Sequence, residues 1–319
     1  MDNIRVRKLT GASNASDLAA VLTLMQHVQP DIHRSFELLH WQYLKTPAGS
    51  GNIFTLWDDE VLAAVYCAVT QQVQVEEAVL PARMVQDVMT HPNYRGRGFL
   101  HRLAKMCLEE IQKSGAIGYT FPNELSQGSF RRTGWTELCQ IPLRMKDIIS
   151  TPSISVNSVI VQELHGSFSP PASQIWVSSK MVMGVVRDYK YLNWRYKKPG
   201  QKYRSYLLNT NKGILVLKLY DNGSKRSLHI CELFVSAECI PLVSDALSFA
   251  ESCARIYGAQ TLTAWVGPHH PYAQYFANAK FPLSDRLKRF MFVTGPESVA
   301  GAIERSAGWH ISQGDSDVY

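Results

Sequence analysis

Residues 85–115 read VQDVMTHPNYRGRGFLHRLAKMCLEEIQKSG. The run Val85–Thr90 is rich in residues that favour β-structure, and we expect a strand there. Two glycines then stand at positions 96 and 98, and from Leu100 onward apolar residues recur every three or four positions. That spacing places them on one face of a helix. The stretch therefore predicts a strand, a glycine-rich turn and an amphipathic helix, in that order.

The turn itself reads Tyr94-Arg95-Gly96-Arg97-Gly98. A turn at a helix N-terminus directs several free backbone N–H groups at one point, with the positive end of the helix dipole behind them. Glycine lets a ligand approach the backbone closely, and the two arginines add positive charge. The turn therefore predicts a pyrophosphate cradle, with a solvated surface turn as the alternative. The Walker spacing and the three-glycine dinucleotide pattern are both absent from the sequence.

The composition is that of a globular protein. A length of 319 residues suggests about two domains, and 45% hydrophobic with 19% charged residues excludes a disordered chain. No apolar run is long enough for a membrane helix, and the start MDNIRVRKLT predicts no secretory signal. Six scattered cysteines predict reduced thiols in a cytoplasmic protein. The net charge of +6 favours anionic ligands, but it is too small to indicate a nucleic-acid binder.

An internal repeat indicates a duplicated domain. Leu39–Tyr43 reads LHWQY and Leu192–Tyr196 reads LNWRY, each followed by Lys and Pro. Phe130 with Trp135 in the first half is echoed in the second half by a similar aromatic pair. The Ser- and Pro-rich stretch in the middle of the chain reads as a linker. We therefore expect an N-terminal domain over residues 1–149, a linker over 150–178, a second domain over 179–294 and a polar tail over 295–319.

The glycine-rich turn resembles the pyrophosphate motif of the GNAT superfamily, the Gcn5-related N-acyltransferases, which reads R/Q-x-x-G-x-G/A. Arg95 and Gly98 match this motif, whereas Leu100 stands where the family has Gly or Ala. A later family motif resembles Asn123–Ser126 and the residues after it, with Phe130 in place of the family's usual Tyr. The resemblance covers about residues 1–145. Together with the repeat it implies a mixed-sheet α/β fold of two tandem GNAT-like domains.

The second of these domains is expected to be degenerate. The segment LFVSAECIPLV, which leads into its corresponding helix, contains neither glycine nor arginine. A diphosphate cannot be held there by the same backbone geometry, so we expect one acyl-CoA site per chain. The second half would instead shape an acceptor cleft or an interface between copies of the chain.

The resemblance implies an acyltransferase in which a primary amine attacks the thioester of acyl-CoA directly. A backbone N–H of the fourth strand, near Val88 or Met89, would then meet the oxyanion, with Thr90 beside the pantetheine arm. No metal is expected, because the exposed pair His269-His270 lacks further ligands at a suitable spacing. The residues expected at acyl-CoA are Val88, Met89, Thr90, Arg95, Gly96, Arg97, Gly98, Phe99, Leu100, Asn123, Ser126 and Phe130.

The proton-transfer residues are left open by the sequence. Asp87 is a carboxylate inside an apolar strand and is the first candidate for general base, with a structural hydrogen bond as the alternative. His91 could relay a proton through water or simply lie in the turn. Because Phe130 cannot protonate the thiolate, Ser126, Tyr119 or solvent would do so. A third interpretation needs no dedicated base, since holding the amine near the thioester already accelerates the reaction.

The acceptor is expected near His40 and Trp41, with Asp87 and His91, although Trp41 and Trp194 also fit core positions. The resemblance extends to tandem family members of surface-polysaccharide pathways. It implies a nucleotide-linked amino sugar as acceptor, such as a dTDP-3-amino-3,6-dideoxyhexose, and either acetyl-CoA or 3-hydroxybutanoyl-CoA as donor. Acylation of aminoglycoside or protein amines, and a non-catalytic acyl-CoA-binding module, are the alternatives.

The ending WHISQGDSDVY, residues 309–319, is polar. It predicts a solvated tail, with a tail folded back over the acceptor cleft as the alternative.

Overall fold

The computed structural model describes residues 4–10, 15–148, 159–267, 269–295, 301 and 309–316. Its first half contains β1 (Ile4–Leu9), α1 (Ala15–Val28), α2 (Phe36–Leu44), β2 (Asn52–Asp58), β3 (Val61–Val75), β4 (Ala78–Thr90), η1 (Pro92–Tyr94), α3 (Phe99–Lys113), β5 (Ile117–Thr120), α4 (Glu124–Arg132) and β6 (Thr136–Asp147). The second half contains β7 (Val161–Leu164), α5 (Pro171–Ser179), β8 (Met183–Val185), α6 (Tyr189–Arg195), β9 (Arg204–Leu208), β10 (Gly213–Asp221), β11 (Arg226–Val235), η2 (Ala237–Cys239), α7 (Leu242–Ile256), β12 (Thr261–Trp265), α8 (Ala273–Asn278), β13 (Leu283–Thr294), β14 (Trp309–His310) and η3 (Gln313–Asp315).

The two halves share one mixed sheet. Its strands follow the order β1-β2-β3-β4-β5-β13-β6-β12-β11-β10-β9-β7. The β4–β5 and β11–β12 pairs are parallel, and the other pairs along this order are antiparallel. The predicted mixed-sheet α/β class is confirmed.

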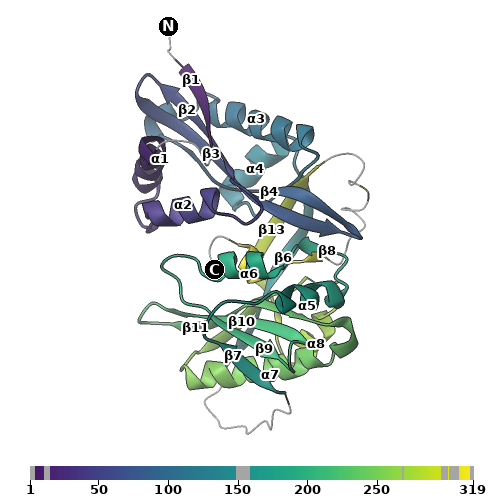
Figure 1. The fold of residues 1–319 in the computed structure, drawn as a ribbon. Helices are drawn as coiled ribbons and strands as arrows, with labels where there is room; N and C mark the ends of the chain where they lie inside the picture. Colours follow the sequence, from purple (N-terminus) through teal and green to yellow (C-terminus); the bar gives the residue numbers. More distant parts are fainter. Residues whose placement is uncertain are drawn as a thin grey trace.

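The halves exchange strands where they meet. β13, from the second half, lies between β5 and β6 of the first, and β6 in turn pairs with β12 of the second. In Figure 1 these two strands run through the middle of the molecule, between the purple-blue and the green half. Each half is therefore completed by a strand that the other half supplies.

The sheet of the first half is buried on both faces. Alternate residues of β3 point to opposite sides, so that Val65 and Cys67 pack with α1 and α2, whereas Ala64 and Tyr66 pack with α3. The apolar face predicted for α3 is the buried one, and it includes Leu103. These helices hold β4, and with it the end of the strand that carries the predicted site, in a fixed position.

The predicted linker contains ordered structure. β7 and all but the last residue of α5 lie within residues 150–178, while residues 149–158 fall outside the described part of the chain. The Pro170-Pro171 pair that suggested a linker instead begins α5, because proline fits the first turn of a helix. The remaining domain limits stay a prediction.

The expectation of a solvated tail is wrong for residues 309–316. Trp309 pairs through β14 with β8, and the tail side chains from His310 to Ser316 are buried. His270, expected in an exposed loop, is also buried, and its Nε2 lies 3.0 Å from Nδ1 of His310. The polar tail can be buried because side chains of His310, Ser312, Gln313 and Asp315 each bind a partner in the second half. Asp317 lies outside the described residues.

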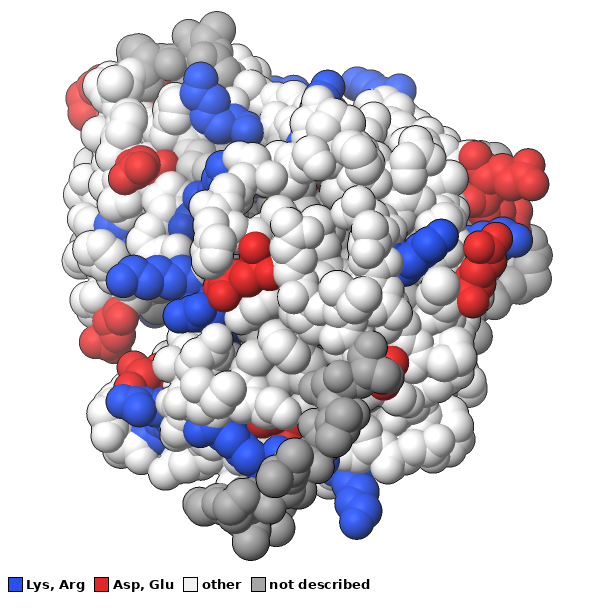
Figure 2. All heavy atoms as spheres, turned by 60° about the horizontal axis from the view of Figure 1, so that its bottom comes forward, with Lys and Arg blue, Asp and Glu red and all other residues white. Residues whose placement is uncertain are grey.

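The charged side chains on the face shown in Figure 2 are interspersed. Blue and red residues lie scattered over a mostly white surface, without a continuous band of one sign among the residues drawn in colour. None of the helices in the described ranges has the length and apolar character that a membrane span requires.

Candidate active site

The fourth and fifth strands of the first half separate. β4 and β5 pair only from Ala82 to Met84 on one strand and from Ile117 to Tyr119 on the other. β4 then continues to Thr90, whereas β5 ends at Thr120. A cavity of about 260 Å³ opens where they diverge. Its walls are Met84–Met89 of β4, Thr120–Asn123 after β5, Ser126 and Phe130 of α4, and Gln29, Ile32 and Arg34 between α1 and α2.

A β-bulge interrupts β4 at this cavity. Val65 pairs with Met89 and Cys67 with Gln86, so that Tyr66 alone faces both Asp87 and Val88. Asp87, within the bulge, has a positive φ of 49°, a conformation that glycine usually adopts at such a position. A bulge leaves one residue out of the ladder, so a backbone N–H in this pair is freed from strand pairing. This is the place where the sequence predicted the oxyanion donor at Val88, with Met89 as the neighbouring choice.

The glycine-rich turn lies at the end of the same strand. Gly96 and Gly98 have φ of 79° and 74°, which side chains disfavour, and a Cβ at either position would meet no atom within 4 Å. The positive φ therefore explains the glycines, and crowding does not. Gly98 is the N-cap of α3, and the first bond within the helix runs from the Arg102 N–H to the Gly98 carbonyl. The N–H groups of residues 99–101 consequently have no partner inside the helix.

The side chains around the turn divide into two sets. Arg95 and Arg97 are exposed, and the Arg97 guanidinium lies 4.9 Å from the Tyr94 ring centroid. Phe99 and Leu100 are half-buried and pack on the core beneath α3. The leucine that departs from the family pattern thus points its side chain into the core, which leaves its backbone N–H on the helix terminus.

Asp87 is bound by three side chains. Its Oδ1 lies 3.0 Å from Arg34 Nη2, and its Oδ2 accepts from Tyr43 Oη at 2.7 Å and from Gln42 Nε2 at 3.4 Å. The Arg34 and Asp87 side chains are 8% and 11% exposed. Burial, and then the Asp87 carboxylate, raise the pKa of Tyr43 well above its ordinary value, so Tyr43 is a neutral donor. Asp87 borders the cavity as a carboxylate anchored to α2 and to the residues before it.

The α4 residues have local structural partners. Asn123 is the N-cap of α4, and its side chain accepts from the Ser126 N–H at 3.0 Å. The Ser126 hydroxyl donates to the Asn123 carbonyl at 3.2 Å. Phe130 is buried, with its ring 5.3 Å from that of Trp135. Tyr119, the other candidate acid, does not line the cavity, and its hydroxyl donates to Gln71 instead.

The residues predicted for the acceptor lie in other surroundings. The His91 Nδ1 accepts from the Asn93 N–H at 3.3 Å, and its ring stacks on His27. His40 stacks on Phe36. Neither histidine belongs to the cavity wall, nor does Thr90, which pairs with Ala64 in the ladder.

Trp41 lies where the two halves meet. Its ring stacks on Trp194 at 4.7 Å, and each indole N–H donates to the other tryptophan's carbonyl at 3.1 Å. The repeated LHWQY and LNWRY motifs therefore contact each other in a reciprocal pair, which agrees with their interpretation as packing residues.

Sequence reasoning did not identify Arg34 and Tyr43. A signal was present, because the repeat extends backward to Arg34 and Arg187, each seven positions before its tryptophan. Each arginine forms an ion pair with a carboxylate of a neighbouring strand, Asp87 or Glu232.

Residues 6–138 match the sequence profile of the acetyltransferase (GNAT) domain. Over these residues the chain is similar to a GNAT acetyltransferase domain. The prediction of an acyltransferase is thereby confirmed, and acyl-CoA is the co-substrate that GNAT domains use. A comparison with curated protein sequences gives no match. Within the described ranges, His, Cys, Asp and Glu side chains form no group of three or more that could hold a metal ion.

Solved structures of a probable N-acyltransferase and of GCN5-related N-acetyltransferases share the fold over most of the chain. A probable N-acyltransferase from Enterococcus faecalis V583 has a TM-score of 0.67 at 14% identity, over 96% of this chain and 74% of its own. A GCN5-related N-acetyltransferase from Anabaena variabilis ATCC 29413 has a TM-score of 0.68 at 14% identity, over 91% and 72%. Another from Kribbella flavida has a TM-score of 0.64 at 16% identity, over 92% and 71%. At such identities the likeness concerns the fold.

Proposed function

We propose that the chain transfers an acetyl or 3-hydroxybutanoyl group from CoA to the amino group of a nucleotide-linked amino sugar. The observation that carries the acyl-transfer part is the alignment of three features along one strand: the cavity beside β4, the bulge at Asp87–Val88, and the glycine turn after the strand. A CoA molecule needs a slot for its pantetheine arm and hydrogen-bond donors for its diphosphate, and these features provide both, one after the other along β4.

In this proposal the backbone N–H groups from Gly96 to residue 101 and the side chains of Arg95 and Arg97 hold the diphosphate. The pantetheine arm lies along residues 85–89, opposite Asn123, Ser126 and Phe130. A backbone N–H freed by the bulge, at Val88 or Met89, stabilises the oxyanion that forms when the amine attacks the thioester carbonyl.

The acceptor would enter from the side of the cavity formed by Gln29, Ile32 and Arg34. Asp87 would accept the proton that the ammonium group must lose, and Ser126 or solvent would protonate the departing thiolate. The excess of basic over acidic residues supports a phosphorylated acceptor.

A base-free mechanism is supported by a specific observation. Both oxygens of Asp87 already accept hydrogen bonds from Arg34, Tyr43 and Gln42, which makes the carboxylate a structural anchor as well as a candidate base. Correct placement of the amine would then carry the rate, and solvent would take the proton.

The test is release of free thiol from acetyl-CoA and 3-hydroxybutanoyl-CoA with a panel of amines: a nucleotide-linked amino sugar, the same amino sugar without its nucleotide, an aminoglycoside and a lysine peptide. We expect thiol with the nucleotide-linked amino sugar and at least tenfold less with the other acceptors. Equal rates with the free amino sugar would contradict the acceptor class. CoA binding without thiol release for any amine would favour a non-catalytic binding module.

A further inference from the structure

The second half repeats the carboxylate site of the first. Glu232 on β11 lies 3.0 Å from Arg187 Nε and 3.2 Å from Tyr196 Oη, as Asp87 lies beside Arg34 and Tyr43. β11 also carries an extra residue beside its carboxylate, because Val216 pairs with Glu232 and Leu217 with Ile230. The position that borders an open cavity in the first half thus has a counterpart in the second.

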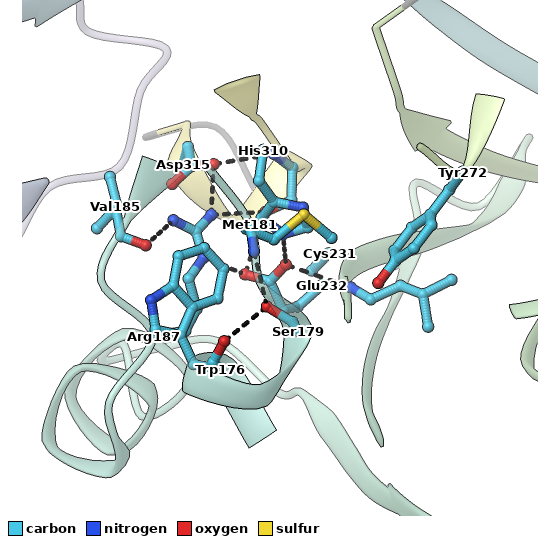
Figure 3. Close-up of polar contacts among 12 residues, drawn as sticks. Trp176, Ser179, Met181, Val185, Arg187, Cys231, Glu232, Tyr272, His310 and Asp315 are labelled. Atoms are coloured by element: carbon cyan, nitrogen blue, oxygen red, sulfur yellow. Dashed lines mark hydrogen bonds and ion pairs between the residues drawn. The ribbon is translucent and has the colours of Figure 1, made fainter. Parts of the chain in front are cut away.

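The tail occupies that counterpart. His310 Nε2 lies 2.9 Å from Glu232 Oε1, and the Ser312 hydroxyl lies 3.3 Å from Oε2. Figure 3 shows His310 and Asp315 of the tail close to Arg187 and Glu232. The tail is also held as a strand, since Trp309 and His310 pair with Met183 and Gly184 of β8.

The slot between β11 and β12 is filled as well. These strands pair from Ser227 to Ile230, and beyond that point a residual hollow of about 20 Å³ is lined in part by His310 and Ile311. The Leu233 N–H, which is the counterpart of the Val88 N–H, donates to Glu232 Oε1 at 3.2 Å and is therefore already used. In the first half the corresponding region is the 260 Å³ cavity.

The docked tail supplies partners for two buried arginines of the second half. Arg187 and Arg195 are 0% and 4% exposed. Glu232 supplies one buried carboxylate, and Asp315 of the tail supplies a second, 2.6 Å from Arg187 Nη2. Arg195 donates to the carbonyls of Gly314 and Ser316. Without the tail, two buried guanidinium groups would have lost one carboxylate and two carbonyl acceptors, which is strongly unfavourable.

The far end of the docked tail reaches the first half. Gly314, Asp315 and Ser316 line a hollow between the halves together with Gln42, Met84 and Gln86. Met84 and Gln86 also line the acyl-transfer cavity. The tail therefore lines a small neighbouring hollow, which shares Met84 and Gln86 of β4 with the cavity.

We propose that the acyl-CoA slot of the second half has become a docking site for the chain's own residues 309–316, and that docked residues 314–316 help to select the acceptor. Docking stands on the contacts alone, whereas acceptor selection rests on the proposed function. The second half then holds residues 309–316 close to the catalytic cavity.

The test uses the chain truncated after residue 308 and a labelled peptide of residues 309–319. We expect one peptide bound per truncated chain by fluorescence anisotropy, and at least tenfold weaker binding for the matched peptide with Asp315→Asn. A scrambled peptide is the second control. Absent binding by a truncated chain that is shown to be folded, or equal binding of the Asp315→Asn peptide, would overturn docking even if the chain had no transferase activity.

Kinetics test the second part of the proposal. Truncation should lower kcat/KM for the acceptor at least tenfold, leave the KM for acyl-CoA within twofold, and be reversed by adding the peptide. Peptide binding without any change in acceptor kinetics would overturn acceptor selection. If the truncated chain does not fold, full-length Asp315→Asn should raise the KM for the acceptor and not that for acyl-CoA; an unchanged acceptor KM would overturn the proposal.

Discussion

Replacement of Asp87 by asparagine tests whether this carboxylate acts as a general base or only stabilises the local structure. Asparagine keeps the shape of the side chain and can still accept from Tyr43, which lies 2.7 Å away. It removes the negative charge 3.0 Å from Arg34, in a pair whose side chains are 8% and 11% exposed. Breaking a buried ion pair by removing one partner costs about 3–5 kcal/mol, and because the Tyr43 bond survives we expect the lower end, about 3 kcal/mol.

The repeat supplies a matched control, Glu232→Gln. It removes the equivalent carboxylate of the second half, where Asp315 remains 2.6 Å from Arg187 and partly compensates. We expect a loss of about 1.5–3 kcal/mol of unfolding free energy, the range for a hydrogen bond to a charged group. Because Glu232 contacts the tail and does not border the cavity, kcat at saturating acceptor should stay within a few-fold of the wild type.

Urea unfolding gives the stability of both variants, and thiol release between pH 5 and 9 gives their activity. A general base contributes about 10²–10⁴-fold, so Asp87→Asn should lower kcat by at least a hundredfold and flatten its acidic limb. Wild-type turnover across the pH range would show that Asp87 only anchors the bulge. Equal losses of kcat in both variants would mean that stability, and not proton transfer, controls the rate.

Three further outcomes are expected. Replacement of both Arg95 and Arg97 by alanine should raise the KM for acyl-CoA tenfold or more, because each charge-assisted hydrogen bond contributes about 1.5–3 kcal/mol. Thermal stability should be unchanged, since both side chains are exposed. An unaltered KM would contradict the proposed diphosphate cradle. Calorimetric titration should give one CoA per chain, and a second site would contradict a slot filled by the tail. Desolvation, with Lys218 and Lys225, lowers the pKa of His229 to about 4 from about 6.5. The unfolded chain therefore binds more protons between these values, so unfolding free energy should rise by about 2–3 kcal/mol as the pH rises from 4 to 6.5, and His229→Gln should diminish that rise in urea unfolding.

The local part of the site could be predicted from the sequence. The order of strand, glycine turn and helix over residues 85–115 is encoded in neighbouring residues, and Gly96 and Gly98 do adopt the positive φ that the cradle requires. The positive φ of Asp87 could not be predicted. It arises because β3 and β4 pair out of step at Tyr66, and that depends on how two strands align in the sheet.

The burial of the tail could not be predicted either. Residues 309–316 are polar, and a polar ending is usually solvated. Here the tail carries Asp315 to Arg187 and offers backbone carbonyls to Arg195, so its polarity is the reason for its burial. That complementarity exists only once the second half has brought the two arginines together.

The strand exchange makes the GNAT domain depend on the second half. β5, which borders the acyl-transfer cavity at Thr120, pairs on one side with β4 and on the other with Phe292–Thr294 of β13. Without the second half this short strand would be an open edge, and β6 would lose both of its neighbours, β13 and β12. The second half can therefore lack a diphosphate cradle and still be indispensable, because it supplies a strand behind the cavity, the reciprocal contact of Trp194 with Trp41, and the contacts that hold the tail. The proposed single acyl-CoA site in a chain of two similar halves is consistent with this arrangement, in which the second half completes the fold of the first.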